Sequence, residues 1–186
     1  MSGGHHVDPS NKKIALLISV LALVLAFSET LAKSAQTAAI SYNIEASNLW
    51  SFFQAKNIRM TTVRTAAEAA EVESQQNALP EKRKALEDRI QKWKEIAARY
   101  DSEPETNEGR KELAVRAKAA EQQRTRSMAA YHHFELSSAA LQIAIVLASA
   151  EIITGVALLA WLSGGLGVVG IVFALIGLFA PMAVHF

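Results

Sequence analysis

The sequence of 186 residues contains no cysteine. This absence excludes a disulfide framework, a thiolate nucleophile and a metal site with sulfur ligands. The chain also has no excess of one charge, because 19 Lys and Arg residues stand against 18 Asp and Glu residues. Nucleic-acid-binding proteins need a basic surface to neutralise phosphates. We therefore expect no nucleic acid among the partners.

Charge is almost absent from three long stretches, residues 14–32, 138–162 and 166–184. Each has about the length of roughly 20 apolar residues that an α-helix needs to cross a bilayer. Their only ionisable residues are Glu29 and Glu151. We predict three transmembrane helices, with the lipid bilayer as a partner and with Ser163-Gly164-Gly165 as the turn between the second and the third.

Residues 1–13 form a polar N-terminal tail with an adjacent pair, His5-His6. Two histidines without a carboxylate partner are more often solvated than metal-bound. Lys12-Lys13 before the first apolar stretch also resembles the start of a secretory signal peptide. We expect the segment to be retained as the first transmembrane helix.

Glycine and proline, which interrupt helices, are missing between Lys33 and Pro80. The stretch therefore predicts one helix that continues from the first span to about Asn77. Along it, one set of residues recurs at alternating steps of four and three, the spacing of a helix that packs on another helix. The set is Leu49, Phe53, Lys56, Met60, Val63, Ala67 and Ala70, of which only Lys56 is polar.

Pro80 predicts a turn followed by a new helix, because proline disfavours a helical residue before it and suits the first helical turn. This second helix, residues 81–100, repeats the four-and-three spacing and would fold back with Ile90 near Ala67. A loop at residues 101–107 precedes a third helix, from about Glu108 to near Trp161. The predicted fold is all-α, with three transmembrane helices and a helical, coiled-coil-like stalk at residues 33–137.

The stalk carries the block Glu45-Ala46-Ser47-Asn48-Leu49-Trp50-Ser51-Phe52-Phe53-Gln54-Ala55-Lys56-Asn57-Ile58-Arg59. The block, after a lysine-led first span, resembles a family of uncharacterised bacterial three-span membrane proteins, classed as a domain of unknown function. The Trp-x-Phe-Phe-Gln-Ala-Lys part is its most specific element. The resemblance implies the architecture and no established activity.

Glu151 is the candidate intramembrane polar site. We expect it near the bilayer centre, midway between Ser138 and Trp161, where an ionisable group costs several kcal/mol and faces protein or a cavity. Either it fixes packing as a protonated carboxyl group, or it carries protons or cations. Glu29 is the second candidate, and Lys33 four residues later favours a local ion pair.

A homo-oligomer is expected from two groups of residues. Trp50, Phe52 and Phe53 would be only partly covered in a lone stalk, and the glycine-rich third span would have too few partners within one chain. The candidate contacts in that span are Gly170, Ala174 and Gly177. His132 and Glu135, three residues apart, offer two metal ligands, but two ligands do not make a site.

The sequence contains no recognised catalytic signature, so we expect neither an enzyme nor a cofactor. Two functions stay open. The first is a self-associating structural or assembly protein, which includes contacts with other membrane proteins. The second is a proton or cation pathway, resembling stator proteins in architecture only. We expect the bacterial inner membrane. Lys12 and Lys13 favour a cytoplasmic N-terminus, whereas Lys33, Arg124 and Arg126 favour a cytoplasmic stalk, and of these two orientations we expect the second.

Overall fold

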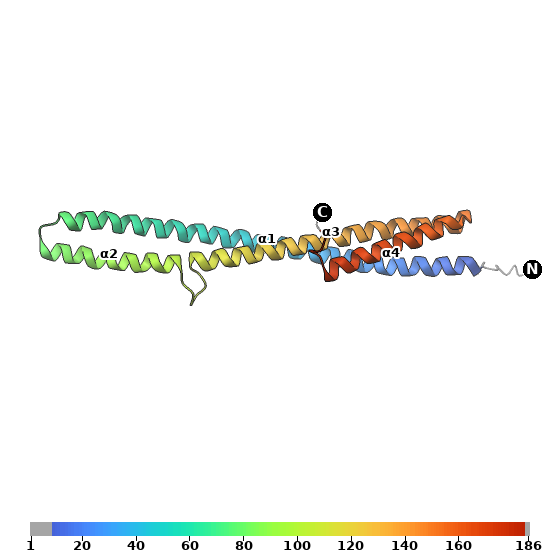
Figure 1. The fold of residues 1–186 in the computed structure, drawn as a ribbon, viewed down its shortest axis with the longest axis horizontal. Coiled ribbons are helices and arrows are strands. Elements are labelled where there is room, and N and C mark those ends of the chain that lie inside the picture. Colours follow the sequence, from blue (N-terminus) through green and yellow to red (C-terminus); the bar gives the residue numbers. More distant parts are fainter. Residues whose placement is uncertain (1–8, 185–186) are drawn as a thin grey trace, which may run out of the picture. The chain divides into compact units, whose positions relative to one another are not determined.

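The computed structural model describes residues 9–184. It contains four helices, α1 (Pro9–Gln76), α2 (Pro80–Asp101), α3 (Arg110–Thr154) and α4 (Ala157–Phe179), shown in Figure 1. No strand occurs among these residues. The all-α prediction is confirmed, and three of the helices, α1, α3 and α4, are long and apolar enough to cross a membrane.

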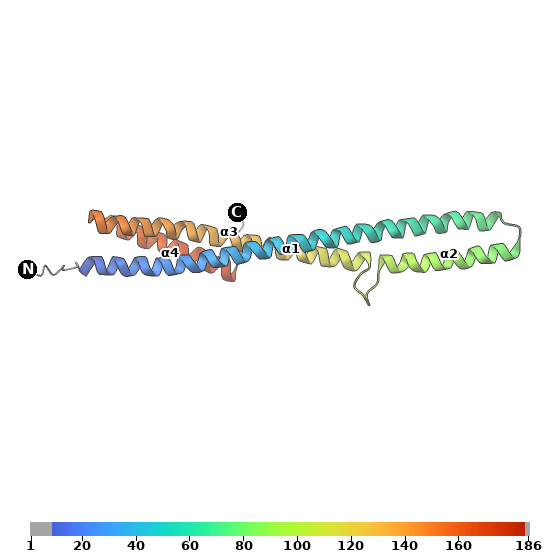
Figure 2. The ribbon, with the colours of Figure 1, turned by 180° about the vertical axis from the view of Figure 1, so that it is seen from behind.

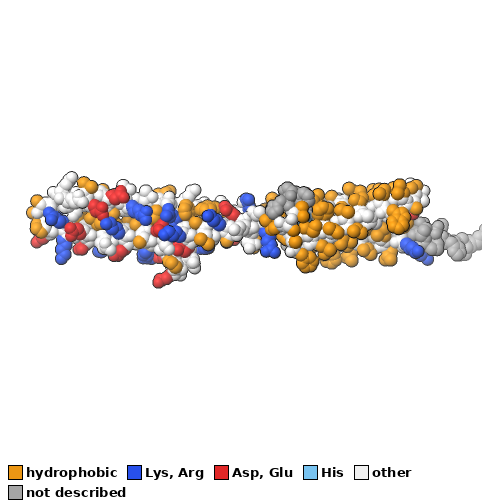
Figure 3. All heavy atoms as spheres, in the orientation of Figure 1, with side chains coloured by type: hydrophobic (Ala, Val, Ile, Leu, Met, Phe, Trp, Pro, Cys, Tyr) orange, Lys and Arg blue, Asp and Glu red, His pale blue; other side chains and the backbone are white. Residues whose placement is uncertain are grey.

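The chain divides into two compact units. Met1–Ile40 and Gln123–Phe186 form one, here the apolar unit, and Ser41–Gln122 form the other, here the polar unit. Hydrophobic side chains cover the visible face of the apolar unit, whereas Lys, Arg, Asp and Glu side chains are spread over the polar unit (Figure 3). The segregation of charge in the sequence is therefore also a segregation in space.

α1 is a single helix of 68 residues, which confirms the predicted continuity past Phe53. α3 is likewise uninterrupted from the polar unit into the apolar unit. The turn before α2 lies where Pro80 predicts it, and the backbone N–H of Leu79 donates to Asn77 Oδ1 at 3.2 Å. In both ribbon views α2 runs beside the second half of α1 (Figures 1 and 2).

The predicted turn at Ser163-Gly164-Gly165 is wrong, because these residues lie inside α4. The chain turns at Gly155 and Val156 instead. Gly155 adopts φ 68°, a left-handed conformation that ends a helix and that glycine takes without a steric penalty. Its N–H donates to the carbonyl of Glu151 at 2.8 Å. The helix predicted as the second span therefore ends at Thr154 and not at Leu162, and the helix predicted as the third begins at Ala157 and ends at Phe179.

The polar unit has two apolar clusters along α1. Ala67, Ala70 and Ile90 form the first, with Leu86 and Trp93 against it, so the predicted approach of Ile90 to Ala67 is confirmed. The second joins α1 to α3 and consists of Ala46, Leu49, Leu113, Ala117 and Ala120. These contacts use the four-and-three positions of each helix, as the periodicity predicts.

The apolar unit packs α1, α3 and α4 around Leu21, Leu141 and Ala144. Two of the hydrogen bonds between its helices are buried. The hydroxyl groups of Ser28 and Ser137 lie 3.0 Å apart and are buried, and Ser163 Oγ donates to the carbonyl of Ala144 at 2.7 Å. Ser163 thus lies inside α4 with its hydroxyl group hydrogen-bonded to the neighbouring helix.

Candidate functional site

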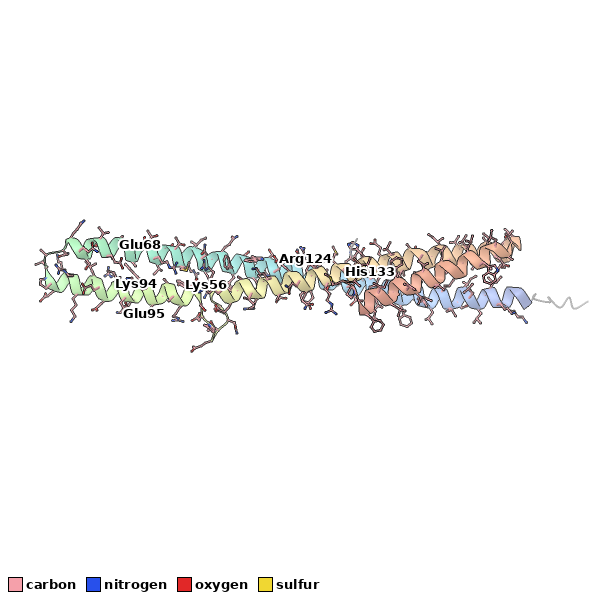
Figure 4. The ribbon with its side chains drawn as sticks, viewed as in Figure 1. Lys56, Glu68, Lys94, Glu95, Arg124 and His133 are labelled. Carbon is pink, nitrogen blue, oxygen red and sulfur yellow. The ribbon has the colours of Figure 1, made fainter. Side chains whose placement is uncertain are left out.

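Lys56 is the polar residue in the seam of α1, and it is buried with 7% of its surface exposed. Its ammonium group lies 3.9 Å from carboxylate oxygens of both Glu103 and Glu108. The rings of Phe52 and Tyr100 lie 5.3 and 5.6 Å from the same nitrogen. Figure 4 labels Lys56 beside the connection between α2 and α3. A buried charge is tolerated here because two carboxylates and two aromatic faces surround it.

The connection at residues 102–109 is folded onto the start of α3 by Glu112. Ser102 Oγ donates to Glu112 Oε1 at 2.6 Å, and the backbone N–H of Glu103 donates to Oε2 at 3.1 Å. Gly109 makes this approach possible, because a β-carbon there would collide with Glu112 Oε2 and with the backbone nitrogen of Glu103. Glu112 thus holds the loop closed over Lys56.

Arg110 connects all three helices of the polar unit. Its Nη2 donates to Asp101 Oδ1 at 2.6 Å at the end of α2, and its Nη1 donates to Asn57 Oδ1 at 3.1 Å on α1. Lys111 also binds Asp101, with Nζ 2.7 Å from Oδ2. We call Lys56, Asp101, Glu103, Arg110 and Glu112 the junction cluster.

Three carboxyl groups of the junction cluster have lowered pKa values. The hydrogen bond from Lys111 is the main cause for Asp101, with Arg110 adding to it. Hydrogen bonds from Arg99 lower the pKa of Glu103, and the hydrogen bond from Ser102 lowers that of Glu112. Each partner favours the charged form of the carboxyl group. The cluster is therefore held together by ionised carboxylates.

A cavity of about 440 Å³ lies beside Lys56. Its walls carry both signs of charge, from Lys56, Arg99, Glu103 and Glu108, next to Ile96 and Tyr100. No group of three or more His, Cys, Asp or Glu side chains that could hold a metal ion occurs in the described part of the chain. The arrangement is suited to holding helices in place, since its charges neutralise one another.

The aromatic residues predicted as oligomer contacts have partners within the chain. Trp50 Nε1 donates to Glu121 Oε1 at 2.8 Å, and its ring meets that of Phe53 edge to face at 5.4 Å. Both rings pack on the cluster that contains Leu113. Phe52 remains 37% exposed. Trp50 and Phe53 therefore join α1 to α3, and Phe52 covers Lys56.

Glu151 lies in the last turn of α3, three residues before its end at Thr154. The expectation that it sits midway along a span is wrong, because α3 stops well before Trp161. The side chain is buried, with 9% of the residue exposed, and its Oε2 has no hydrogen bond with the described residues. Glu151 is thus a buried carboxyl group at the end of an apolar helix.

Glu29 on α1 accepts a hydrogen bond from Gln142 Nε2 on α3 at 3.1 Å. The sequence predicted Lys33 as its partner, and the structure provides an amide from another helix instead. The structure does not bring Glu29 and Glu151 together, because the partner of Glu29 on α3, Gln142, lies nine residues before Glu151. The two residues do not form one polar site.

Three glycines of α4, Gly167, Gly170 and Gly177, pack closely within the chain. A β-carbon at Gly170 would lie 2.7 Å from Leu141 Cγ, and one at Gly177 would lie 3.1 Å from His133 Cβ and Phe134 Cε1. Gly167 approaches Leu21 on α1 in the same way. Gly170 and Gly177, which the sequence suggested as oligomer contacts, therefore have close partners within one chain. Ala174, between them, is half-buried.

Sequence reasoning missed two buried polar contacts in the apolar unit. His133 is 1% exposed, stacks on Phe173 with ring centroids 6.3 Å apart, and has Nε2 3.2 Å from the carbonyl oxygen of Pro181. The other is the pair Ser28 and Ser137. Their spacing along the chain gives no signal, since each partner is more than 40 residues away. His132 Nδ1, by contrast, lies 3.6 Å from Glu135 Oε2 on the exposed side of α3.

These features define an all-helical protein with three helices able to cross a membrane and a helical polar unit between the first and the second. The chain belongs to the family described as Domain of unknown function (DUF4337), whose model matches residues 10–180. No curated protein and no solved structure matches the chain. The family description carries no activity.

Proposed function

We propose that the protein is a multi-pass structural or assembly protein of the bacterial inner membrane that associates with itself. One observation carries the proposal: the charged residues of the junction cluster form contacts that join α1, α2 and α3. Lys56 and Glu112 both bind the connection between α2 and α3, and Arg110 joins α1 to α2, which is the pattern of a mechanical connection. The proposal includes no catalytic activity and no cofactor.

Exposed apolar side chains support self-association. Ile44, Ile58 and Val72 in the polar unit are 55%, 65% and 55% exposed. Covering such side chains stabilises a protein in water by about 25 cal/mol per Å² of apolar area that is removed from water. A second copy of the chain, or another membrane protein, would cover them. Lys33, Arg124 and Arg126 favour a cytoplasmic position for this unit.

The proposal is tested by measuring the mass of the full-length protein in a mild detergent and in small lipid discs. We expect a defined oligomer that persists on dilution well below micromolar concentration. A strictly monomeric protein in both environments contradicts self-association. A monomer in detergent with an oligomer in lipid would show that the bilayer contributes to assembly.

A proton or cation pathway is the alternative, and the buried Oε2 of Glu151 is the observation in its favour. The position of Glu151 in the last turn of α3 weakens the pathway alternative. A single carboxyl group at the end of the helix leaves the rest of α3 without a group that could pass on a proton or cation. Purified protein in vesicles would dissipate a proton or sodium gradient if the alternative holds, and Glu151→Gln would abolish the flux. Vesicles that hold both gradients contradict it.

A further inference from the structure

α1 carries two seams along the polar unit. One faces α2 and α3 and contains the buried residues Ala46, Leu49, Lys56, Met60 and Ala67. The other consists of residues that recur every seven positions, Ile44, Ser51, Ile58, Thr65 and Val72, and all five are exposed. Ile58 follows Lys56 by two residues, and at 3.6 residues per turn this places the second seam about 200° around the helix. The two seams therefore lie on opposite sides of α1.

Four further residues complete the exposed seam, Asn48, Ala55, Thr62 and Ala69, which lie four residues after each of the first four. They are also exposed. The resulting steps of four and three continue over four heptads without a charged residue. We call these nine positions the outer seam.

The outer seam differs from the outward surface of α2. In α2, 12 of 22 residues are charged, as is usual for the solvent side of a helix. In the outer seam, Ile44, Ile58 and Val72 leave 55%, 65% and 55% of their surfaces exposed. An uncharged face on one helix of an otherwise charged unit requires its own explanation.

The polar groups of the outer seam are arranged for packing. Ser51 Oγ donates to the carbonyl of Ser47 at 2.9 Å, and Thr62 Oγ1 donates to the carbonyl of Ile58 at 3.0 Å. Both hydroxyl groups are thus satisfied by their own helix. A shallow groove of about 650 Å³ runs along Ile58, Thr62, Thr65 and Ala69. A partner helix in this groove would leave the hydrogen bonds of Ser51 and Thr62 in place.

We propose that the outer seam is the surface on which a second copy of this chain docks, with the two α1 helices parallel and in register. This inference rests on the proposed self-association and names its surface. A spacing of four and three selects a helix as the occupant. Two copies held in one membrane by the same first span present α1 in the same direction, and their confinement raises the effective concentration. In register, Asn48 opposes Asn48, the residue type that fixes alignment in paired parallel helices.

The charged residues beside the outer seam distinguish parallel from antiparallel docking. One substitution there strengthens association in the first arrangement and weakens it in the second. In parallel docking, Glu68 of one copy lies beside Glu73 of the other, since flanking positions five residues apart face each other across such a seam. Glu73→Lys would turn this repulsion into attraction and strengthen association several-fold. In an antiparallel arrangement that places Arg59 beside Glu73, the same substitution would weaken association.

The experiment uses the natural absence of cysteine. Ser51→Cys and Thr65→Cys are made singly in the full-length protein, which is reconstituted in vesicles and oxidised. We expect both variants to form disulfide-linked dimers at least ten times faster than the control Val115→Cys, an exposed position on α3. Equal rates for all three variants overturn the inference.

A second measurement separates this inference from the proposed function. Ile58→Glu is expected to lower the association constant at least ten-fold in lipid discs, and Val115→Glu is expected to change it less than two-fold. If the oligomer forms and Ile58→Glu leaves it unchanged, another surface mediates assembly, so the inference fails and the proposed function stands. If the unmodified protein is monomeric and none of the cysteine variants cross-links, both fail.

Discussion

In the apolar unit α1 meets α3 through Ser28 with Ser137 and through Leu21 with Leu141, whereas in the polar unit the same two helices meet through Leu49 with Leu113 and Asn57 with Arg110. The first set consists of neutral hydrogen bonds and close packing. The second combines aliphatic burial with charged groups. One pair of helices thus uses two kinds of contact within a single chain.

The difference agrees with the surroundings that we propose for the two units, lipid for the apolar unit and water for the polar unit. In lipid there is no hydrophobic gain from bringing helices together, so small residues and interhelical hydrogen bonds decide packing. Gly170 against Leu141 and Ser163 against Ala144 are contacts of this type. In water, burial of Leu113 and Ile90 supplies the driving force, and ion pairs such as Arg110 with Asp101 fix the arrangement.

The largest effect is expected from removing aliphatic burial in the polar unit. Leu113 is completely buried, so Leu113→Ala should lower the free energy of unfolding by about 2–5 kcal/mol. Val115→Ala on the same helix is the control, because Val115 is 69% exposed. Urea unfolding in mild detergent, followed by tryptophan fluorescence, measures both. Similar losses in the two variants would contradict the assigned buried face of α3.

Close packing in the apolar unit is tested at Gly170. Gly170→Ala places a carbon 2.7 Å from Leu141 Cγ and should destabilise the unit by about 1–3 kcal/mol, the usual range for overpacking. Gly164→Ala is the matched control, since a β-carbon there meets nothing within 4 Å. Loss of helicity on titration with a denaturing detergent is the measurement. A neutral Gly170→Ala would show that α4 does not pack on α3 through this glycine.

The junction cluster is tested at Lys56. Lys56→Met keeps the aliphatic stem and removes the charge, and we expect a loss of about 1 kcal/mol. The value is modest because the ammonium group lies 3.9 Å from each carboxylate and Glu108 is half exposed. The same substitution at the exposed Lys118 should have no measurable effect in urea unfolding. A more stable Lys56→Met protein would mean that the desolvation of the ammonium group costs more free energy than its contacts with Glu103 and Glu108 contribute.

The smallest expected effect is a loss of stability of the polar unit at acid pH. The pKa values of Asp101, Glu103 and Glu112 are lowered by folding, so their stabilisation is complete above the unfolded-state values of about 4 and is lost as pH falls through the lower folded values. We expect unchanged stability from pH 7 to 5 and a decline below about pH 4. Asp101→Asn should flatten this decline. An identical acid profile for both proteins would contradict the role of Asp101.

The sequence alone predicts the features that depend on near neighbours. The absence of glycine and proline after Lys33 predicts the uninterrupted α1, and Pro80 predicts the start of α2. The four-and-three spacing predicts which face of each helix is buried, and the family resemblance agrees with the matched family. These predictions hold because helix continuity and amphipathicity are set by residues within one or two turns of one another.

The tertiary structure decides which partners meet across helices. The sequence contains four candidate glycines near the end of the second span, and only Gly155 takes the left-handed conformation that ends α3. The choice depends on contacts such as Ser163 with Ala144, which keep the later glycines helical. The place of Glu151 in the last turn of α3 follows from that choice. The partners of Lys56 are likewise decided by the tertiary structure, and they are Glu103 and Glu108. The register between α1 and the α2–α3 connection is fixed by packing along the whole seam and by no single local motif.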